Sequence, residues 1–482
     1  MSASVGSIPP VLLRPLALAL ASVLILGGCS VIPTPLSDAD RTARASDDRS
    51  HLFEAQEPLG GPLTLEQAVA RGIRYNLDHR VRLMEETLAS GALEVSRYDL
   101  WPQLMAQAGY SSRDSYAASE SVSIDSRQTS LEPSFSTEKQ QGLGGLRFSW
   151  NILDFGVSYA QAQQRADEVL VVGELRRKAE QNLVLDIQAA WWRVAAAQQS
   201  AAEIQTLLVQ AEDALAKSGQ SLESRLNPPL KALTLQKGLL ELINRLAQLR
   251  KEARLAHVQL AGLLNLAPGT PYEVASSPEE LPQPPALAVE EMESLALTAR
   301  PELREEDYRK RITAQEARKA LLRMLPGIEL NAGANYDSNK YLDNQSWADA
   351  GLQVSWNLFS VFSGPAARRY AEGQMDLGDL RRLALSVAVI TQVHVAREQH
   401  EQALADYRTA VRLDEVEGKI ATQLEAEQRA SRVDPAQVVM GRASALAAKL
   451  RRSLAFAELQ SSVARIRHSV GEDPVQVAAQ GS

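Results

Sequence analysis

Polar and apolar positions follow two different periods along this chain. From residue 144 to 152 every second side chain is apolar, with polar residues between, which is the period of a β-strand; the apolar positions are Leu146, Phe148, Trp150 and Ile152. From Leu183 to Leu208 the apolar residues recur at steps of four and three, as in the heptad seam of a coiled coil. The pattern predicts a strand that leads into a long helix over about 159–219.

The same two periods assign most of the remaining chain. Thr64 is an N-cap with Gln67 three residues later, as in a capping box, and Pro102 ends the first helix. Prolines 228 and 229 break the long helix. The expected helices are 64–100, 159–219, 230–266, 365–429 and 435–470, and the expected strands are 103–110, 144–152, 328–336 and 351–358.

The two halves of the chain repeat each other. Gly351–Leu358 reproduces the pattern of Gly145–Ile152 at an offset of 206, and Pro301–Arg304 matches Leu77–Arg80 at an offset of 224. A duplication this long organises the whole chain. We therefore expect a signal peptide at 1–28, a tether at 29–61, a first repeat at 62–270, a linker at 271–286, a second repeat at 287–470 and a C-terminal tail at 471–482.

Composition restricts the function more than it identifies it. The 482 residues are 45% hydrophobic and 23% charged, which is typical of a folded chain, and the net charge of −8 argues against a nucleic-acid partner. The six histidines are scattered, and no phosphate loop, zinc motif or nucleophile elbow is present. Charged runs such as Arg300–Arg311 are interpreted as solvated helix faces. We expect no enzymatic activity, no metal site and no cofactor.

The N-terminus carries an export signal. Residues 11–26 are mostly apolar and end in Leu26-Gly27-Gly28-Cys29, which resembles the lipobox of bacterial lipoproteins. That resemblance implies cleavage before Cys29, the only cysteine of the chain, and its lipidation, for example with palmitate. Ser30 then fits release to the outer membrane. The alternative is an ordinary signal peptide with an incidental cysteine.

The strands have the alternation of a transmembrane barrel, with apolar residues on one face and polar residues on the other. Four strands cannot close a barrel, whose small end is about eight, so chains must pool strands, and three chains give twelve. Aromatic residues near the strand ends fit the membrane interface: Trp150, Phe155, Trp356 and Phe359. The alternative is a soluble sheet buried against the helices.

Four motifs together resemble the TolC family of outer-membrane efflux proteins, in its lipoprotein branch. They are the Leu63-Thr64-Leu65-Glu66 helix start, the Trp101-Pro102 strand entry, the segment Trp150–Gly156, and the internal duplication, and the match covers residues 61–470. The resemblance implies a mainly α chain with a membrane β-barrel, assembled as a homotrimer with a 12-stranded barrel and an α-helical tunnel across the periplasm. It also implies a channel-tunnel without catalytic activity that exports substrates by docking a periplasmic adaptor (membrane fusion) protein and an inner-membrane RND or ABC transporter.

The resemblance also implies where the gate and the adaptor contact lie, namely at the helix breaks. Val433-Asp434 matches the family's constriction, and Gln437 and Asn227 stand where further acidic residues are usual. The expected adaptor-contact residues are Ser224, Arg225, Leu226, Ser431, Arg432 and Val433. The alternative role of Asp434 is a helix N-cap followed by proline. The competing function for the whole chain is a periplasmic coiled-coil scaffold lipoprotein without channel activity.

Overall fold

The computed structural model describes residues 33–54, 56–129, 132–223, 229–276 and 280–473, in two compact units, 1–57 and 58–482. Cys29 and the signal peptide lie outside the described residues. Within the first unit, the segment expected to be only a tether contains the helix α2 (Asp38–His51), capped by Ser37 through a capping box with Asp40. None of the side chains of α2 is buried.

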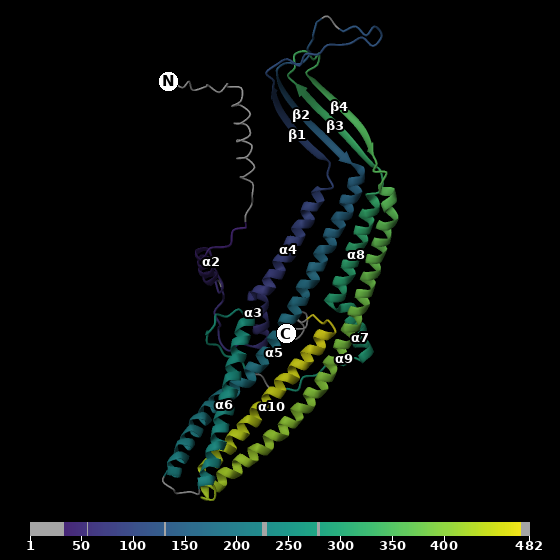
Figure 1. Ribbon diagram of the computed structural model, residues 1–482. Helices are drawn as coiled ribbons and strands as arrows, with labels where there is room; N and C mark the ends of the chain where they lie inside the picture. The colour runs from purple at the N-terminus through teal and green to yellow at the C-terminus, as the bar shows by residue number, and fades with distance from the viewer. Residues whose placement is uncertain (1–32, 55, 130–131, 224–228, 277–279, 474–482) are drawn as a thin grey trace, which may run out of the picture. The chain divides into compact units, whose positions relative to one another are not determined.

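The second unit runs twice through one order of elements: two short helices, two strands, a long helix and a shorter one (Figure 1). The first series is α3 (Leu65–Tyr75), α4 (Leu77–Tyr98), β1 (Gln103–Ser112), β2 (Gln140–Asn151), α5 (Ile152–Glu223) and α6 (Pro229–Leu263). The second is α7 (Val289–Ala299), α8 (Pro301–Leu322), β3 (Gly327–Asp337), β4 (Ser346–Ser355), α9 (Ser360–Arg429) and α10 (Pro435–Ser469).

The long helices begin earlier than the heptad seam predicted. Asn151, the last residue of β2, caps α5 directly, because its Oδ1 accepts hydrogen bonds from the backbone N–H of Leu153 (3.0 Å) and Asp154 (3.2 Å). Asn357 accepts from Phe359 N–H in the second repeat (3.1 Å), and α9 contains Pro365, where its start was predicted. Strand and long helix are thus joined without a loop in the first repeat.

The predicted helix 64–100 is wrong in one respect, because it is two helices. Asn76, between α3 and α4, has an extended backbone (φ −62°, ψ 124°), and Arg300 between α7 and α8 has nearly the same one (φ −64°, ψ 128°). Asn76 accepts from His79 N–H (3.1 Å) and donates to the carbonyl of Leu263 at the end of α6 (3.1 Å). The break therefore satisfies the ends of two helices at once.

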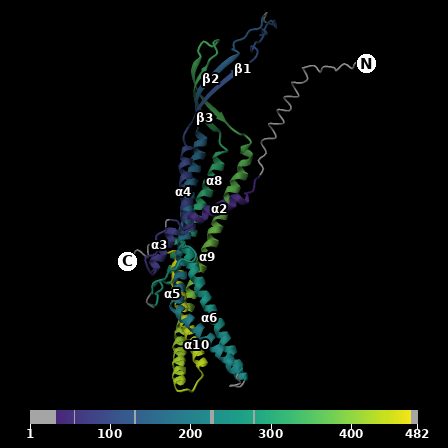
Figure 2. The ribbon, with the colours of Figure 1, turned by 90° about the vertical axis from the view of Figure 1, so that its left-hand side faces the viewer.

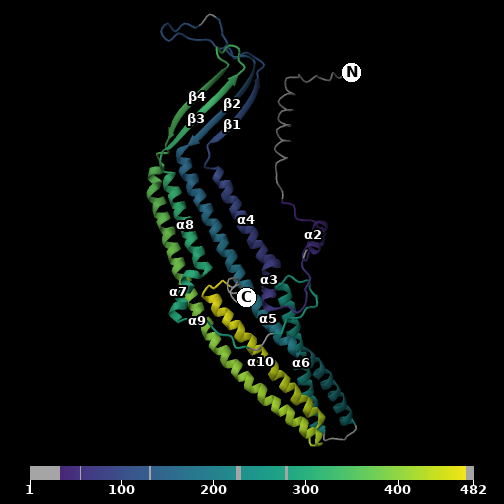
Figure 3. The same cartoon turned by 180° about the vertical axis from the view of Figure 1, so that it is seen from behind.

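The sheet and the α9–α10 turn lie at opposite ends of the second unit (Figures 1 and 3). The strands pair antiparallel in the order β1-β2-β3-β4, and β2 pairs with β3 across the two repeats. Toward the sheet, the helices pack in the matching order α4-α5-α8-α9; toward the turn, the order is α6-α5-α10-α9. As Figure 2 also shows, α4 and then α6 lie along α5, and α8 and then α10 lie along α9.

Three apolar clusters hold the helices together. The middle of α5 packs on α3 and on the end of α6 around the buried Ile187 and Trp191, whose Nε1 donates to the carbonyl of Leu63 (2.9 Å). A second cluster joins α5, α6 and α10 around Ile204, Leu246 and Leu446. A third joins α7, α8, α9 and α10. The heptad seam predicted from the sequence is therefore buried along α5 except at Ala201, which is exposed.

One substitution at two glycines should change stability in opposite directions. A Cβ on Gly72 in α3 would lie 2.1 Å from Cδ1 of Ile187, whereas a Cβ on Gly91 in α4 has no atom within 4 Å. Overpacking should make Gly72→Ala lower the free energy of unfolding by about 1–2 kcal/mol. Helix propensity should make Gly91→Ala raise it by roughly 0.5–1 kcal/mol. Thermal unfolding followed by circular dichroism measures both, and equal effects would contradict the packing described here.

Candidate functional site

The sheet has apolar side chains on one face and polar side chains on the other, and the apolar face carries no charged residue. Cross-strand partners keep the two sets in register, as in Phe148↔Ala332↔Ala350. The apolar face contains no charged residue; its apolar side chains are Leu104, Ala106, Ala108, Tyr110, Leu146, Phe148, Trp150, Ile328, Leu330, Ala332, Ala334, Tyr336, Ala348, Ala350, Leu352 and Val354. Leu104 and Leu352 leave 69% and 65% of their surface exposed, so the helices of the described chain do not cover this face.

The opposite face of the sheet is polar. It carries Gln103, Gln107, Arg147, Ser149, Asn151, Glu329, Asn331, Asn335, Asp349 and Gln353, beside Leu143, Met105 and Trp347. In β3 the polar residues are half-buried while the apolar residues between them are exposed. Apolar residues toward the surroundings and polar residues toward a sheltered side are the arrangement of a lipid-facing strand with a wet interior.

The four predicted interface aromatics lie together where the sheet meets the helices. Trp150, next to the last residue of β2, packs edge-to-face on Phe155 in the first turn of α5, with ring centroids 6.2 Å apart. Trp356 follows β4, and its Nε1 donates to the carbonyl of Met324 (3.1 Å). Phe359 is 80% exposed. Phe155 and Trp356 are also exposed, whereas Trp150 is half-buried. Aromatic residues at one end of an apolar sheet face are the pattern found at a membrane–water boundary.

At the far end of the unit, a tight turn joins α9 to α10. Ser431 adopts a left-handed backbone (φ 57°), and the N–H groups of Ser431 and Arg432 donate to the carbonyls of Gln428 (2.8 Å) and Glu427 (2.9 Å), which closes the end of α9. Val433 is half-buried, whereas Ser431 and Arg432 are exposed. The corresponding residues of the other hairpin, Ser224, Arg225, Leu226 and Asn227, lie outside the described residues.

Asp434 is the N-cap of α10. Its Oδ1 accepts from Ala436 N–H (2.9 Å), its carbonyl accepts from Gln437 N–H (2.9 Å), and Pro435 occupies the first helical position. Both Asp434 and Gln437 are exposed. The N-cap role predicted as an alternative is therefore confirmed, and it leaves the carboxylate accessible to solvent.

Beside Asp434 is a cavity of about 300 Å³ between α5, α6 and α10. Its walls include Asp213 and Lys217 of α5 and Leu235 of α6. The buried Oγ of Ser218, also in its wall, has no hydrogen-bond partner in the described part of the chain. The two helical hairpins are thus incompletely packed against each other at this end.

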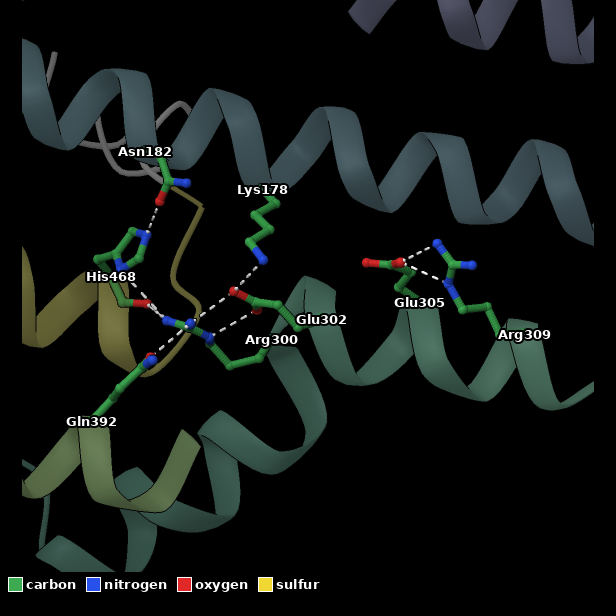
Figure 4. A network of polar contacts seen from close by, with 8 residues as sticks. All are labelled: Lys178, Asn182, Arg300, Glu302, Glu305, Arg309, Gln392 and His468. Carbon is green, nitrogen blue, oxygen red and sulfur yellow. Dashed lines mark hydrogen bonds and ion pairs between the residues drawn. The ribbon is translucent and has the colours of Figure 1, made fainter. Parts of the chain in front are cut away.

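Four helices are joined at the α7–α8 break by a polar cluster around the buried Arg300 (Figure 4). Arg300 is only 3% exposed. Its guanidinium donates to both carboxylate oxygens of Glu302 (2.9 and 3.1 Å), to Gln392 Oε1 on α9 (2.9 Å) and to the carbonyl of His468 on α10 (2.9 Å). Nζ of Lys178 on α5 lies 3.6 Å from Glu302. The interpretation of Arg300 as part of a solvated face is therefore wrong.

His468 completes this cluster as a neutral side chain. Its Nε2 lies 2.9 Å from Oδ1 of Asn182 and its Nδ1 lies 3.4 Å from the Arg300 guanidinium. Burial, and then the positive charge of Arg300, lower the pKa of His468 to about 4. Burial alone would raise the pKa of Glu302, but Arg300 and Lys178 hold it below its ordinary value. The cluster thus combines a carboxylate and two cations with an uncharged imidazole.

Arg300 has the same role in its repeat as Asn76 has in the first. Each stands at the single extended residue between two helices, and each binds a carbonyl at the end of the following hairpin, that of Leu263 or of His468. Sequence reasoning missed both positions. The available signal was Pro301, because a proline inside a helical pattern ends the helix at the residue before it.

Within the part of the chain that the structure describes, no group of histidine, cysteine, aspartate or glutamate side chains is arranged to hold a metal ion. Among the helices in the same ranges, none combines the length and the apolar character needed to cross a membrane.

Comparison with known proteins identifies the fold. No protein-family model matches the chain, and no curated protein matches it significantly. Solved structures do: the Campylobacter jejuni CmeC outer-membrane channel (TM-score 0.68, 11% identity, 94% of this chain and 97% of that one) and the outer-membrane channel OprN (0.65, 18%, 84% and 89%). The open state of the Neisseria gonorrhoeae MtrE outer-membrane channel is also similar (0.64, 15%, 85% and 89%). The chain therefore has the fold of these channels, as the resemblance predicted.

The buried cluster predicts a pH dependence of stability. Because the pKa of His468 is near 6.5 in the unfolded chain and about 4 in the folded one, acid protonates the unfolded chain first. The free energy of unfolding should be constant above pH 6.5 and should fall by up to about 3 kcal/mol as the pH decreases to 4. The depressed pKa of Glu302 acts in the same direction, but only below its unfolded value near 4.5.

His468→Asn should flatten the decrease between pH 6.5 and 4.5, measured as the unfolding midpoint by circular dichroism. Gln392→Ala is the matched control, because it removes an acceptor of Arg300 from the same cluster without removing a titrating group. It should lower the midpoint equally at every pH. An unchanged slope in His468→Asn would show that His468 does not titrate as described.

Proposed function

We propose that the chain forms one third of a conduit through the bacterial outer membrane, which exports solutes delivered by an inner-membrane RND or ABC transporter. The observation that carries this proposal is the two-faced sheet: one face is apolar and uncharged, and the other is polar. Within the described ranges of the chain, the edge strands β1 and β4 are each paired on one side only. The similarity to the channel structures supports the same assignment at the level of fold.

Hydrogen bonding then requires assembly. In lipid every backbone N–H and C=O must be paired, so open edges at β1 and β4 are not tolerated. Four strands are too few to close on themselves, whereas three chains supply twelve. Pairing of β1 with β4 of the next copy closes a homotrimeric barrel, with its apolar face toward lipid and its polar face toward the lumen.

The helices offer matching edges for this assembly. Because the helix order follows the strand order, α4 lies beneath the β1 edge and α9 beneath the β4 edge. Both outer helices present exposed apolar and aromatic side chains at similar distances from the sheet, namely Val81, Leu88 and Val95 on α4 and Phe362, Tyr370 and Leu380 on α9. We infer that these two rows contact one another between neighbouring copies and continue the barrel as a helical tunnel.

The tips of the helical hairpins are the proposed inner end of the conduit. An exposed ring of three Asp434 carboxylates, with Gln437 and Asn227 nearby, would narrow the lumen there. The turn Ser431–Val433 and its counterpart Ser224–Leu226 would contact the periplasmic adaptor. The cavity beside Asp434 supports this proposal, because the tips of the two hairpins are less tightly packed there than in the apolar cluster around Ile204 and Leu246. A lipid anchor at Cys29 would add to the hold of the barrel in the membrane.

The oligomeric state tests the proposal first. We expect the lipidated protein, extracted from membranes without heating, to have a detergent-corrected molar mass three times that of the mature chain. Each chain has a sequence mass of 52.5 kDa before processing. A monomer would leave the sheet edges unpaired and would favour the scaffold lipoprotein, in which the apolar face is covered by another protein.

Two substitutions at one position separate the gate role of Asp434 from its cap role. Asp434→Asn keeps an N-cap oxygen and loses the charge, while Asp434→Ala loses both and should cost about 1 kcal/mol of stability. In planar bilayers, both variants should show weaker block by divalent cations than the native protein, and Asp434→Ala should also conduct more. If Asp434→Asn is blocked as strongly as the native protein, the residue is only a cap.

A further inference from the structure

Four glycines on the polar face of the sheet, namely Gly145, Gly327, Gly333 and Gly351, have a polar side chain close to the position that a Cβ of their own would take. A Cβ on Gly351 would lie 2.6 Å from Oδ1 of Asn331, and one on Gly333 would lie 3.0 Å from Oδ1 of Asp349. A Cβ on Gly145 would lie 3.3 Å from both the Gln107 and the Asn335 amide. These polar groups therefore lie where a side chain of the glycine would otherwise stand.

The register makes this a regular pattern. Each glycine is the direct cross-strand partner of the residue that lies over it: Gln107↔Gly145↔Asn335, Asn331↔Gly351, Gly333↔Asp349 and Gly327↔Ser355. At Gly327 the nearest group is Ser355 Oγ, 3.3 Å from the Cβ position. Directly opposed Cβ atoms are only about 4.5–5.5 Å apart, so a side chain can lie flat across the neighbouring strand only where that Cβ is missing.

The glycines of the apolar face differ. A Cβ on Gly144 would meet only the Cβ of Tyr336, at 4.0 Å, and one on Gly142 would be no closer than 3.7 Å to Ser338. These are ordinary van der Waals distances, so the space above these glycines is not filled by a side chain lying across the sheet. On the polar face itself, a Cβ on Gly109 would meet only the Cβ of its partner Leu143, at 4.0 Å. The arrangement therefore belongs to the polar-face glycines that pair with a polar residue.

Side chains that lie flat on the sheet project less far from it, and their hydrogen-bonding groups point along its surface. Asn335 Nδ2 donates to Asp349 Oδ1, so two of these groups are also tied to each other. The result is a low surface of amide, hydroxyl and carboxylate groups over the middle and helix-side parts of the sheet. Such a surface exchanges hydrogen bonds with water and with hydrated solutes, and it is interrupted by the exposed side chains of Met105, Leu143 and Trp347.

We propose that Gly145, Gly327, Gly333 and Gly351 set the bore of the conduit at its sheet end, and make it a wide, hydrated passage for large polar solutes. The proposal rests on the trimeric barrel proposed above, in which this face lines the lumen.

The test is polymer exclusion in planar bilayers, with polyethylene glycols of graded mass added only from the sheet side of the native trimer. In the double variant Gly333→Leu/Gly351→Leu, Asn331 and Asp349 must stand up and two new side chains enter the lumen in each copy. The largest polymer that enters should become smaller and the conductance should fall. Gly144→Leu, the same change on the apolar face, is the matched control and should leave both quantities unchanged.

A second pair of variants keeps the test decisive if the leucine variants do not assemble. Asn331→Ala and Asp349→Ala remove side chains that lie flat, so the polymer cut-off should remain that of the native protein. A larger cut-off would mean that these side chains stand in the lumen, and would overturn the inference.

The outcomes distinguish the two proposals. If the native protein forms pores and the double-leucine variant has the same polymer cut-off, the glycine inference alone is overturned. Native protein that forms no pore overturns the conduit and this inference together. A smaller cut-off in the double-leucine variant with an unchanged Gly144→Leu supports both.

Discussion

Unpaired backbone groups at the two edges of the sheet constrain this molecule more than any other feature. An apolar, uncharged face suits hydrocarbon, but the outward-facing N–H and C=O groups of β1 and β4, which have no strand partner in the described part of the chain, do not. The internal duplication provides one solution, because it gives a chain whose two edges are related: each repeat contributes a hairpin, and the outer strand of one hairpin can meet the outer strand of the other in the next copy. The same relation extends to α4 and α9 below the strands.

Much of this architecture could be predicted from the sequence, because it depends on periodicity. Alternation marks each strand and the heptad seam marks α5, since both record which side chains are buried. The single-residue breaks were missed because Asn76 and Arg300 interrupt the backbone without disturbing the apolar period on either side. The start of α5 was placed too late because Asn151 acts as a strand residue and as a cap, and a seam of buried residues does not record caps.

The residues of the candidate site also fall into two groups: some can be placed from local sequence patterns, and others are brought together only by packing. The aromatic belt residues Trp150, Phe155, Trp356 and Phe359 could be placed from strand ends, and the cap at Asp434 from the proline that follows it. The Arg300 cluster could not, because its partners on α5, α9 and α10 are separated from it by up to 168 residues, and only packing brings them together. The glycine positions were also invisible as a set, since their meaning depends on the cross-strand register.

The correspondence of four helices to four strands fixes how the circumference of the proposed trimer changes along its axis. Twelve tilted strands occupy roughly 6–7 Å of perimeter each, whereas twelve packed helices need about 8–10 Å each. With the number of elements held constant across a junction that has no spare loop at Asn151, the perimeter must widen from sheet to helices. The sheet section then has the smaller circumference of the two. A side chain that lies flat on the sheet instead of pointing into the lumen therefore enlarges the opening by a larger fraction than it would in the helical section.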